Sequence, residues 1–214
     1  MQDKANQNAQ LARTAVWIAK NKKVQGVIFL EDEIRPEALE LISRLKAKGK
    51  KVSLLSGDLT VVANRVAEQL GGMNVIAEVL PEDKNNVIKN LQEQGQTVAM
   101  VGDGVNDAPA LVRANVGIAL GSGTDVSMES SDIVLMNNEL LAVDVAIELS
   151  ARTLKTIKQN IASSIGYNLI MVPLAMSGLL TPLMAAITMP LSSLVVIGNA
   201  ARIRRFFNKK SSLK

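Results

Sequence analysis

Short apolar runs alternate with amphipathic segments over most of the chain. The apolar runs have the length of buried strands and cover residues 27–30, 52–55, 75–77, 97–101, 116–119 and 133–135. The intervening segments have the apolar periodicity of helices and cover residues 36–48, 60–70, 82–94 and 107–113. Regular alternation of short strands and helices predicts an α/β fold in which a parallel sheet is covered on both faces.

Two further segments lie outside this alternation. Residues 14–20 fit either a strand or the tail of a helix, so their interpretation stays open. Residues 139–159 predict one long helix that runs from the soluble part of the chain towards a membrane.

Charge divides the chain into two parts. Charged residues recur every few positions up to about residue 157, whereas none occurs from Ile161 to Ala200. This uncharged stretch is about twice the ~20 residues that a helix needs to cross a bilayer. We therefore expect two transmembrane helices, at about 161–179 and 183–201. The alternative is a buried helical hairpin, but so small a chain could hardly cover two such helices on every side.

Basic residues flank the uncharged stretch on both sides. They are Arg152, Lys155 and Lys158 before it, and Arg202, Arg204, Arg205, Lys209 and Lys210 after it. The positive-inside rule then predicts a multi-pass protein of the bacterial inner (plasma) membrane with both termini in the cytoplasm. The net charge of +4 is interpreted as contact with membrane lipid, not with nucleic acid. The chain has no cysteine or histidine, which excludes zinc ribbons, thiol redox chemistry and histidine-based catalysis within it.

Polar residues follow several predicted strands. Ser56-Gly57-Asp58, Pro81 to Lys84 and Gly102 to Asp107 each come directly after or close to an apolar run. In parallel sheets the chemistry gathers at the carboxyl ends of the strands. A hydroxyl, a lysine and two aspartates four residues apart suit phosphate and Mg²⁺, which prefers oxygen ligands. Taken singly, each segment is better explained by a turn or by a solvated helix residue than by a functional site.

Together these segments resemble P-type ATPases. The run Gly102 to Leu111 reads GDGVNDAPAL, which is similar to the hinge signature of that family. DEIRP at 32–36, SGD at 56–58, Lys84 and GSGTD at 121–125 accompany it in the expected order. The resemblance covers about residues 26–205 and implies a haloacid-dehalogenase-like phosphorylation domain.

The resemblance implies a role for each matching residue. Asp103 would hold Mg²⁺ with support from Asp107, and Ser56 and Lys84 would contact an aspartyl phosphate. The family more often has threonine where Ser56 stands, but serine keeps the hydroxyl. The expected catalytic residues are Ser56, Asp58, Lys84, Asn106 and Asp107, and the expected cofactor-binding residues are Gly57, Gly102 and Gly104.

The apolar stretch resembles the copper-type subclass of heavy-metal (type IB) pumps. Tyr167-Asn168 and Met189 to Ser193 carry that similarity and would bind the transported Cu⁺. Met189 and Ser193 are four residues apart and share a helix face, and a thioether is a soft ligand suited to Cu(I). The alternative is that Met189 faces lipid and that Ser193 is a small residue in helix packing.

The nucleophile segment of the family, Asp-Lys-Thr-Gly-Thr, does not occur in these 214 residues. We therefore interpret residues 1–25 as the end of a nucleotide-binding domain and 26–150 as a phosphorylation domain without its nucleophile strand. Residues 151–205 would form the membrane hairpin, and 206–214 a basic cytoplasmic tail.

The predicted function is that of the C-terminal portion of a copper(I)-translocating ATPase that uses Mg²⁺ and ATP, inactive as an isolated fragment. Its expected partners are membrane lipid, the transported ion and the remainder of the pump on a separate chain. Two alternatives stay open. One is a non-catalytic, membrane-anchored binding or regulatory module, and the other is a membrane-anchored phosphatase of the same fold.

Overall fold

The computed structural model describes residues 14–30, 33–103, 105–121, 125–137 and 139–211. The chain divides into two compact units, Met1–Asp144 and Val145–Lys214. The boundary falls inside a long helix, so the unit boundary differs from the predicted one near residue 150. The predicted assignment of domains to pump functions stays a prediction.

The first strands form an antiparallel ribbon. Strand β1 (Thr14–Lys20) pairs with β2 (Lys23–Leu30) in a register that joins Thr14 to Leu30 and Lys20 to Lys23. The turn residues Asn21 and Lys22 have φ of 48° and 63°, and two left-handed residues are the conformation that joins two strands most tightly. The prediction that 27–30 is a strand of the parallel sheet is therefore wrong, because this turn folds it back onto residues 14–20.

A parallel sheet follows, in two separately hydrogen-bonded pieces. Strand β3 (Ser53–Leu55) pairs with β4 (Asn74–Ile76). The other piece has the order β5-β6-β7, formed by Ala99–Gly102, Val116–Leu120 and Ile133–Leu135. All of these pairings are parallel, as the alternation of strands and helices predicts.

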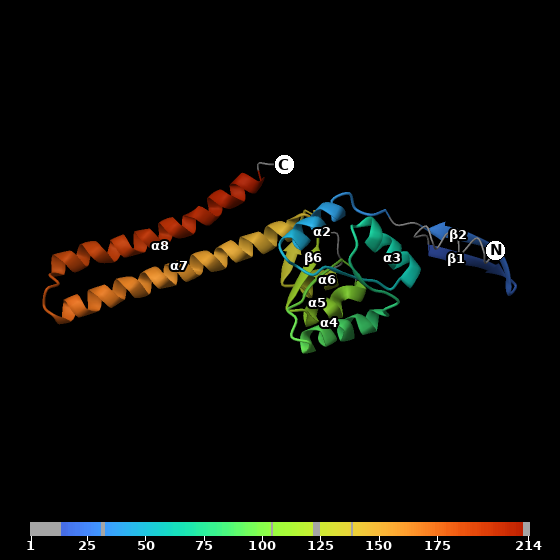
Figure 1. Ribbon diagram of the computed structural model, residues 1–214, viewed down its shortest axis with the longest axis horizontal. Helices are drawn as coiled ribbons and strands as arrows, with labels where there is room; N and C mark the ends of the chain where they lie inside the picture. Colours follow the sequence, from blue (N-terminus) through green and yellow to red (C-terminus); the bar gives the residue numbers. More distant parts are fainter. Residues whose placement is uncertain (1–13, 31–32, 104, 122–124, 138, 212–214) are drawn as a thin grey trace. The chain divides into compact units, whose positions relative to one another are not determined.

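Short helices connect the parallel strands. They are α2 (Ala38–Ala47), α3 (Thr60–Gln69), the 3-10 turn η1 (Pro81–Asp83), α4 (Lys84–Glu93), the 3-10 turn η2 (Val105–Asp107), α5 (Ala108–Arg113) and α6 (Asp125–Glu129). Helix α3 contacts β4, α5 contacts β5 and β6, and α4 lies against α5 (Figure 1). The carboxyl ends of the strands are thus followed by the loops that carry the candidate residues.

Two apolar clusters form the core of the first unit. One contains Ile88, Met100, Ala110 and Leu111, and Leu55 packs against it. The other contains Ala38, Ile42 and Leu70, with Leu140 among the residues packed against it. Because Leu55 belongs to β3 and Met100 to β5, the two pieces of the sheet share a core although they are not hydrogen-bonded to each other.

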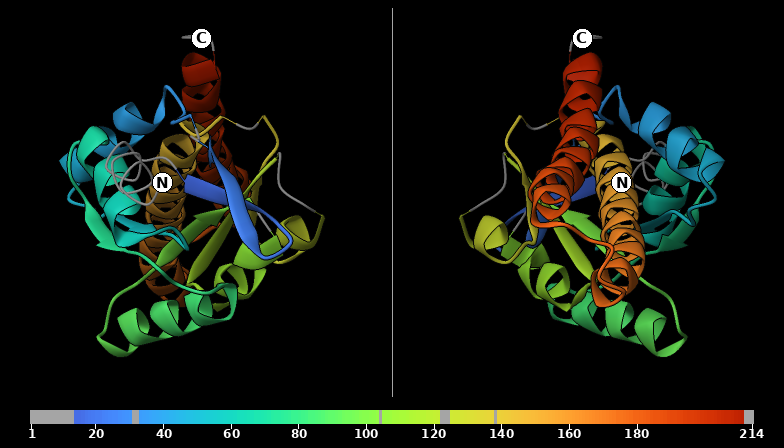
Figure 2. Two further views of the ribbon diagram at one scale, coloured as in Figure 1. Left: turned by 90° about the vertical axis from the view of Figure 1, so that its right-hand side faces the viewer. Right: turned by 90° about the vertical axis from the view of Figure 1, so that its left-hand side faces the viewer.

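Two long helices complete the chain. Helix α7 (Ala142–Met176) and α8 (Pro182–Ser211) run side by side (Figures 1 and 2). Gly178, with φ of 76°, lies in the turn between them. Among the described residues one helix is long and apolar enough to cross a membrane, over Pro182–Arg204 with a mean hydropathy of 1.7. The prediction of two transmembrane helices is therefore not confirmed for α7, which carries polar residues such as Tyr167 and Asn168 within its apolar part.

Candidate active site

The loop after β3 is folded around a serine hydroxyl. The Ser56 hydroxyl donates a hydrogen bond to Asp58 Oδ2 at 2.6 Å and accepts one from the Asp58 backbone N–H at 3.1 Å. The Ser56 N–H donates to the carbonyl of Ile76 at 3.0 Å, which extends the ladder between β3 and β4. A Cβ on Gly57 would lie 3.3 Å from the Val79 carbonyl oxygen, so the absence of a side chain permits this close approach.

Glu78 holds this loop from the neighbouring strand. Its backbone has φ of 58°, and its N–H donates to the Asp58 carbonyl at 3.0 Å. Its carboxylate accepts hydrogen bonds from the N–H (3.1 Å) and the hydroxyl (2.9 Å) of Thr60, the first residue of α3. These hydrogen bonds, led by the one from the Thr60 N–H, lower the pKa of Glu78.

Sequence reasoning missed Glu78 because helix caps are recognised by local spacing. Glu78 lies eighteen positions after the residue that it caps, so no local pattern marks it. A left-handed glutamate is uncommon and costs free energy, which the surrounding hydrogen bonds must offset.

Lys84 and Asp107 form an ion pair between the loops after β4 and β5. Lys84 Nζ lies 2.7 Å from Asp107 Oδ1, and their side chains are 14% and 15% exposed. A Cβ on Gly102 would lie 2.8 Å from both Cβ and Oδ2 of Asp107. Gly102 is therefore required for the packing of Asp107 beside the end of β5.

Asp103 stands next to this pair and is open to solvent. Its side chain is 55% exposed, and Oδ2 lies 4.0 Å from Nη2 of Arg35. Asn106 is exposed on η2, and Gly104 lies outside the described residues. The structure thus joins Ser56 with Asp58 and Lys84 with Asp107, and it gives Asp103 an exposed carboxylate at the same strand end as Asp107.

These residues fit a magnesium ion that is shared with a phosphate. No group of three or more acidic residues that could hold a metal occurs in the described part of the chain. Mg²⁺ commonly needs only one or two carboxylates, with phosphate and water as its other ligands. Asp103 offers an exposed carboxylate of that kind, while Asp107 is paired with a cation.

The predicted copper ligands lie on α7 and α8. The Tyr167 hydroxyl donates to Oγ1 of Thr188 at 3.3 Å, and Thr188 directly precedes Met189. The Ser193 hydroxyl donates to the Met189 carbonyl at 3.4 Å, and Met189 is 65% exposed. Asn168 is exposed as well. The contact between Tyr167 and Thr188 was not foreseen from the sequence.

Comparison with known proteins identifies the class. The family model of the haloacid dehalogenase-like hydrolases matches residues 1–115. A copper-exporting P-type ATPase of Staphylococcus epidermidis is 42% identical over 205 residues, which are 96% of this chain and 26% of the relative. The copper-exporting P-type ATPase B of Archaeoglobus fulgidus is 49% identical over 201 residues, which are 91% of this chain and 29% of the relative.

A solved structure agrees with these relatives. A zinc-transporting PIB-type ATPase in the E2·Pi state matches with a TM-score of 0.81 and 37% identity over 94% of this chain and 33% of the other. The chain belongs to the haloacid dehalogenase-like hydrolases, and over most of its length it is similar to P-type ATPases. The predicted resemblance to heavy-metal pumps is thereby confirmed. The chain spans between about a quarter and a third of the length of these relatives.

Proposed function

We propose that this chain supplies the magnesium- and phosphate-binding edge, and two membrane helices, of an ATP-driven copper(I) pump. The observation that carries the proposal is the grouping of Ser56, Lys84, Asp103 and Asp107 on loops that follow parallel strands. Lys84 Nζ lies 2.7 Å from Asp107 Oδ1, whereas Asp103 is exposed. The ammonium group of Lys84, the exposed carboxylate of Asp103 and the hydroxyl of Ser56 complement the charges of a transferred phosphoryl group and its Mg²⁺.

Each residue then has a distinct role. Asp103 would hold Mg²⁺, which when bound offsets the negative charge of the phosphoryl group. Lys84 would offset further charge on the phosphoryl oxygens, and Asp107 keeps Lys84 in place. Ser56 would donate a hydrogen bond to a phosphoryl oxygen, for which its hydroxyl must rotate away from Asp58. The short loop that Glu78 fastens limits how far Ser56 can move.

The phosphorylated aspartate would come from a strand outside these residues. Strands β3 and β5 share a core through Leu55 and Met100, yet no described residue pairs with the free edge of either strand. An apolar strand that entered between them in parallel would join the two pieces into one sheet. Its carboxyl end would then lie between the loops of Ser56 and Asp103, which is where a nucleophile is needed.

The second unit would carry the ion. The copper-exporting relatives and the thioether of Met189 both favour Cu(I) as the transported ion. Tyr167, Asn168 and Ser193 would complete its path. Helix α7 would form the second membrane span beside α8, because its polar residues would then face the ion path and not lipid. Both termini would lie in the cytoplasm.

A split-pump assay tests this proposal. The full 214-residue chain is co-expressed with a polypeptide of the Archaeoglobus fulgidus relative from which the region matched by this chain has been removed. With radiolabelled ATP, Mg²⁺ and Cu(I), we expect a hydroxylamine-sensitive phosphoenzyme on the partner polypeptide. Asp103→Asn should lower its level by about 100-fold or more, the usual effect of losing one electrostatic contact to the reacting group.

The alternatives predict other results. A phosphoenzyme on this chain alone would contradict the view that its nucleophile comes from elsewhere. Hydrolysis of p-nitrophenyl phosphate by the chain alone would favour a membrane-anchored phosphatase. Stable association with the partner without any phosphorylation would favour a non-catalytic module.

A further inference from the structure

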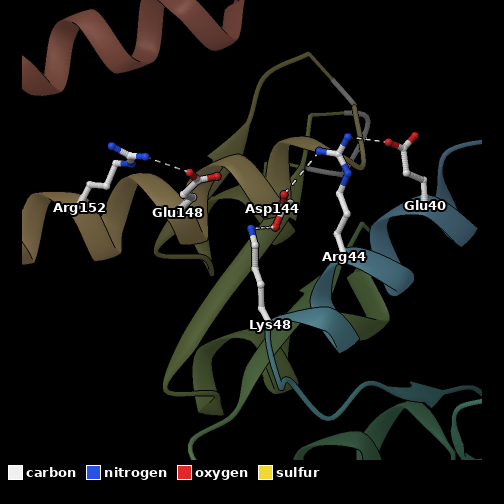
Figure 3. Close-up of polar contacts among 6 residues, drawn as sticks. All are labelled: Glu40, Arg44, Lys48, Asp144, Glu148 and Arg152. Atoms are coloured by element: carbon white, nitrogen blue, oxygen red, sulfur yellow. Dashed lines mark hydrogen bonds and ion pairs between the residues drawn. The ribbon is translucent and has the colours of Figure 1, made fainter.

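The segment 35–48, which contains α2, contacts both the candidate site and the first turn of α7. Arg35, three residues before the start of α2, lies 4.0 Å from Asp103. Near the other end of the segment, Arg44 and Lys48 both contact Asp144, which lies in the first turn of α7 (Figure 3). One short segment built around α2 therefore touches the proposed magnesium ligand at one end and the beginning of a long helix at the other.

Asp144 is buried to an unusual degree. It is 2% exposed, and no other charged residue in the described part of the chain falls in the buried class. Lys48 Nζ contacts its Oδ1, and Nη1 of Arg44 lies 3.6 Å from its Oδ2. A buried carboxylate is tolerated only when cations and hydrogen bonds compensate its lost hydration. Its place in the first turn of a helix adds a favourable interaction with the helix dipole.

Apolar and backbone contacts reinforce this attachment. Leu140, just before α7, packs against the cluster of Ala38, Ile42 and Leu70. Its N–H donates to Glu37 Oε1 at 3.5 Å, and Val143 is 2% exposed. Leu140 and Asp144, at the two ends of this short segment, are thus both held against α2 and the residue before it.

Arg44 has a second partner on its own helix. Its Nη2 lies 2.5 Å from Oε1 of Glu40, on the exposed face of α2. Hydrogen bonding to Glu40, and then attraction to Asp144, raise the pKa of Arg44. Arg44 therefore stays a cation at neutral pH.

A buried ion cluster is a poor choice for stability alone, since apolar residues of the same size often stabilise a core as well or better. The ion cluster instead fixes the register of the two helices. Arg44 and Lys48 are one helical turn apart, so together they determine which turn of α7 lies against which turn of α2. The interior of α2 contains no glycine or proline that would let one half of the helix bend independently of the other.

We infer that Asp144 is a positioning residue for energy coupling, through which a change at Asp103 and Arg35 is passed along α2 to the first turn of α7. This inference rests on the proposed function. Mg²⁺ at Asp103 competes with Arg35 for the same carboxylate and so alters one contact of the segment that leads into α2. The joint at Asp144 passes that alteration to α7, which continues without interruption to Met176.

Hydrogen–deuterium exchange of the full chain in detergent, with Mg²⁺ added together with inorganic phosphate as the probe, tests the inference. In the unmodified chain we expect Mg²⁺ to slow exchange in the loop 102–107 and to change exchange at 142–147. In Asp144→Asn the loop should still respond, while the response at 142–147 is lost. Asp144→Glu, which keeps the charge, should restore part of the response at 142–147.

Two further variants separate coupling from simple loss of structure. Lys48→Gln removes one partner from the exposed side of the joint and should weaken the response at 142–147 without disturbing the core helices α4 and α5. Glu148→Gln removes the exposed pair with Arg152, at 3.5 Å one turn further along α7, and should leave both responses unchanged. This matched control shows whether any lost charge on α7 would have the same effect.

The outcomes are distinguishable. A loop response without a response at 142–147 in the unmodified chain overturns the inference and leaves the proposed function standing. The same holds if Asp144→Asn and Lys48→Gln both retain the response at 142–147. If exchange in the loop 102–107 does not respond at all, the proposed magnesium site is wrong. The coupling inference, which depends on that site, is then wrong as well.

Discussion

Asp107 and Asp144 are both paired with a lysine, but their surroundings differ. The side chains of Asp107 and Lys84 are 15% and 14% exposed, and Asp103 beside them is 55% exposed. Asp144 is 3% exposed and has two cationic partners. A pair that water and ligands can reach can exchange partners when a phosphate arrives. The Asp144 carboxylate is closed to water, although Lys48 and Arg44 are 37% and 44% exposed, so leaving it without a cation is costly and it serves as a joint.

The largest expected effect comes from reversing the charge at the buried pair. Asp144→Lys would place a third cation beside Lys48 and Arg44, so we expect the free energy of unfolding to fall by about 3–5 kcal/mol. Urea unfolding followed by circular dichroism measures it. Glu148→Lys on the exposed part of α7 is the control and should cost less than about 1 kcal/mol. If both variants lost the same free energy of unfolding, the ion pairs of Asp144 would be no more important for stability than the pair of Glu148.

A side chain added at Gly102 tests the packing of the Lys84–Asp107 ion pair. Gly102→Ala would place a methyl group 2.8 Å from Asp107 Cβ, which forces Asp107 away from Lys84. We expect a loss of about 1–3 kcal/mol in the free energy of unfolding. Gly166→Ala is the matched control, because a Cβ there meets nothing within 4 Å and alanine favours a helix. If Gly102→Ala were as stable as the original chain, the close packing of Asp107 would be wrong.

Removing the charge of Lys84 tests whether the Lys84–Asp107 ion pair serves catalysis or stability. Lys84→Gln should lower the free energy of unfolding by only about 1–2 kcal/mol, because Asp107 is partly hydrated and can rearrange. The split-pump phosphoenzyme should fall much further, by about 100-fold. Lys89→Gln, which removes an exposed pair with Glu93 at 3.8 Å, should change neither quantity. A loss of stability with normal phosphorylation would make Lys84 a structural residue.

The smallest effect concerns the fully exposed cap of α3. Because hydrogen bonds from Thr60 lower the pKa of Glu78 in the folded chain, its charge stabilises the fold above the unfolded pKa. That contribution disappears as the pH falls through the folded pKa. Glu78→Gln should therefore have a lower Tm than the original chain at pH 7, and the difference should vanish in acid, once the pH has fallen through the folded pKa of Glu78. A difference that is independent of pH would exclude the charge of Glu78 as its cause.

The regular elements were largely predictable from the sequence. Apolar periodicity placed α2, α3 and α4 within a few residues of their observed bounds, and it placed the parallel strands equally well. These elements depend on local spacing and on burial of one face, both of which the sequence carries. The grouping of Lys84 with Asp107 followed from the rule that loops after parallel strands meet at one edge.

Two of the remaining features depend on contacts between distant residues. Glu78 caps a helix that begins eighteen positions before it. Asp144 meets Lys48 across ninety-six positions. In both cases the partner lies outside any window in which periodicity or capping patterns can be read. The hairpin of β1 and β2 is local, but it places both Asn21 and Lys22 in the left-handed region, and whereas asparagine is common in such turns, lysine does not mark them.

The divided sheet has a practical consequence for handling the chain. No described residue occupies the outer edge of β5, and Val101 on that strand is 36% exposed. Unpaired strand edges offer their backbone groups to any extended polypeptide, including another copy of the same chain. Concentrated solutions should therefore form β-rich aggregates, and a short peptide that adds a strand at this edge should keep the chain monomeric.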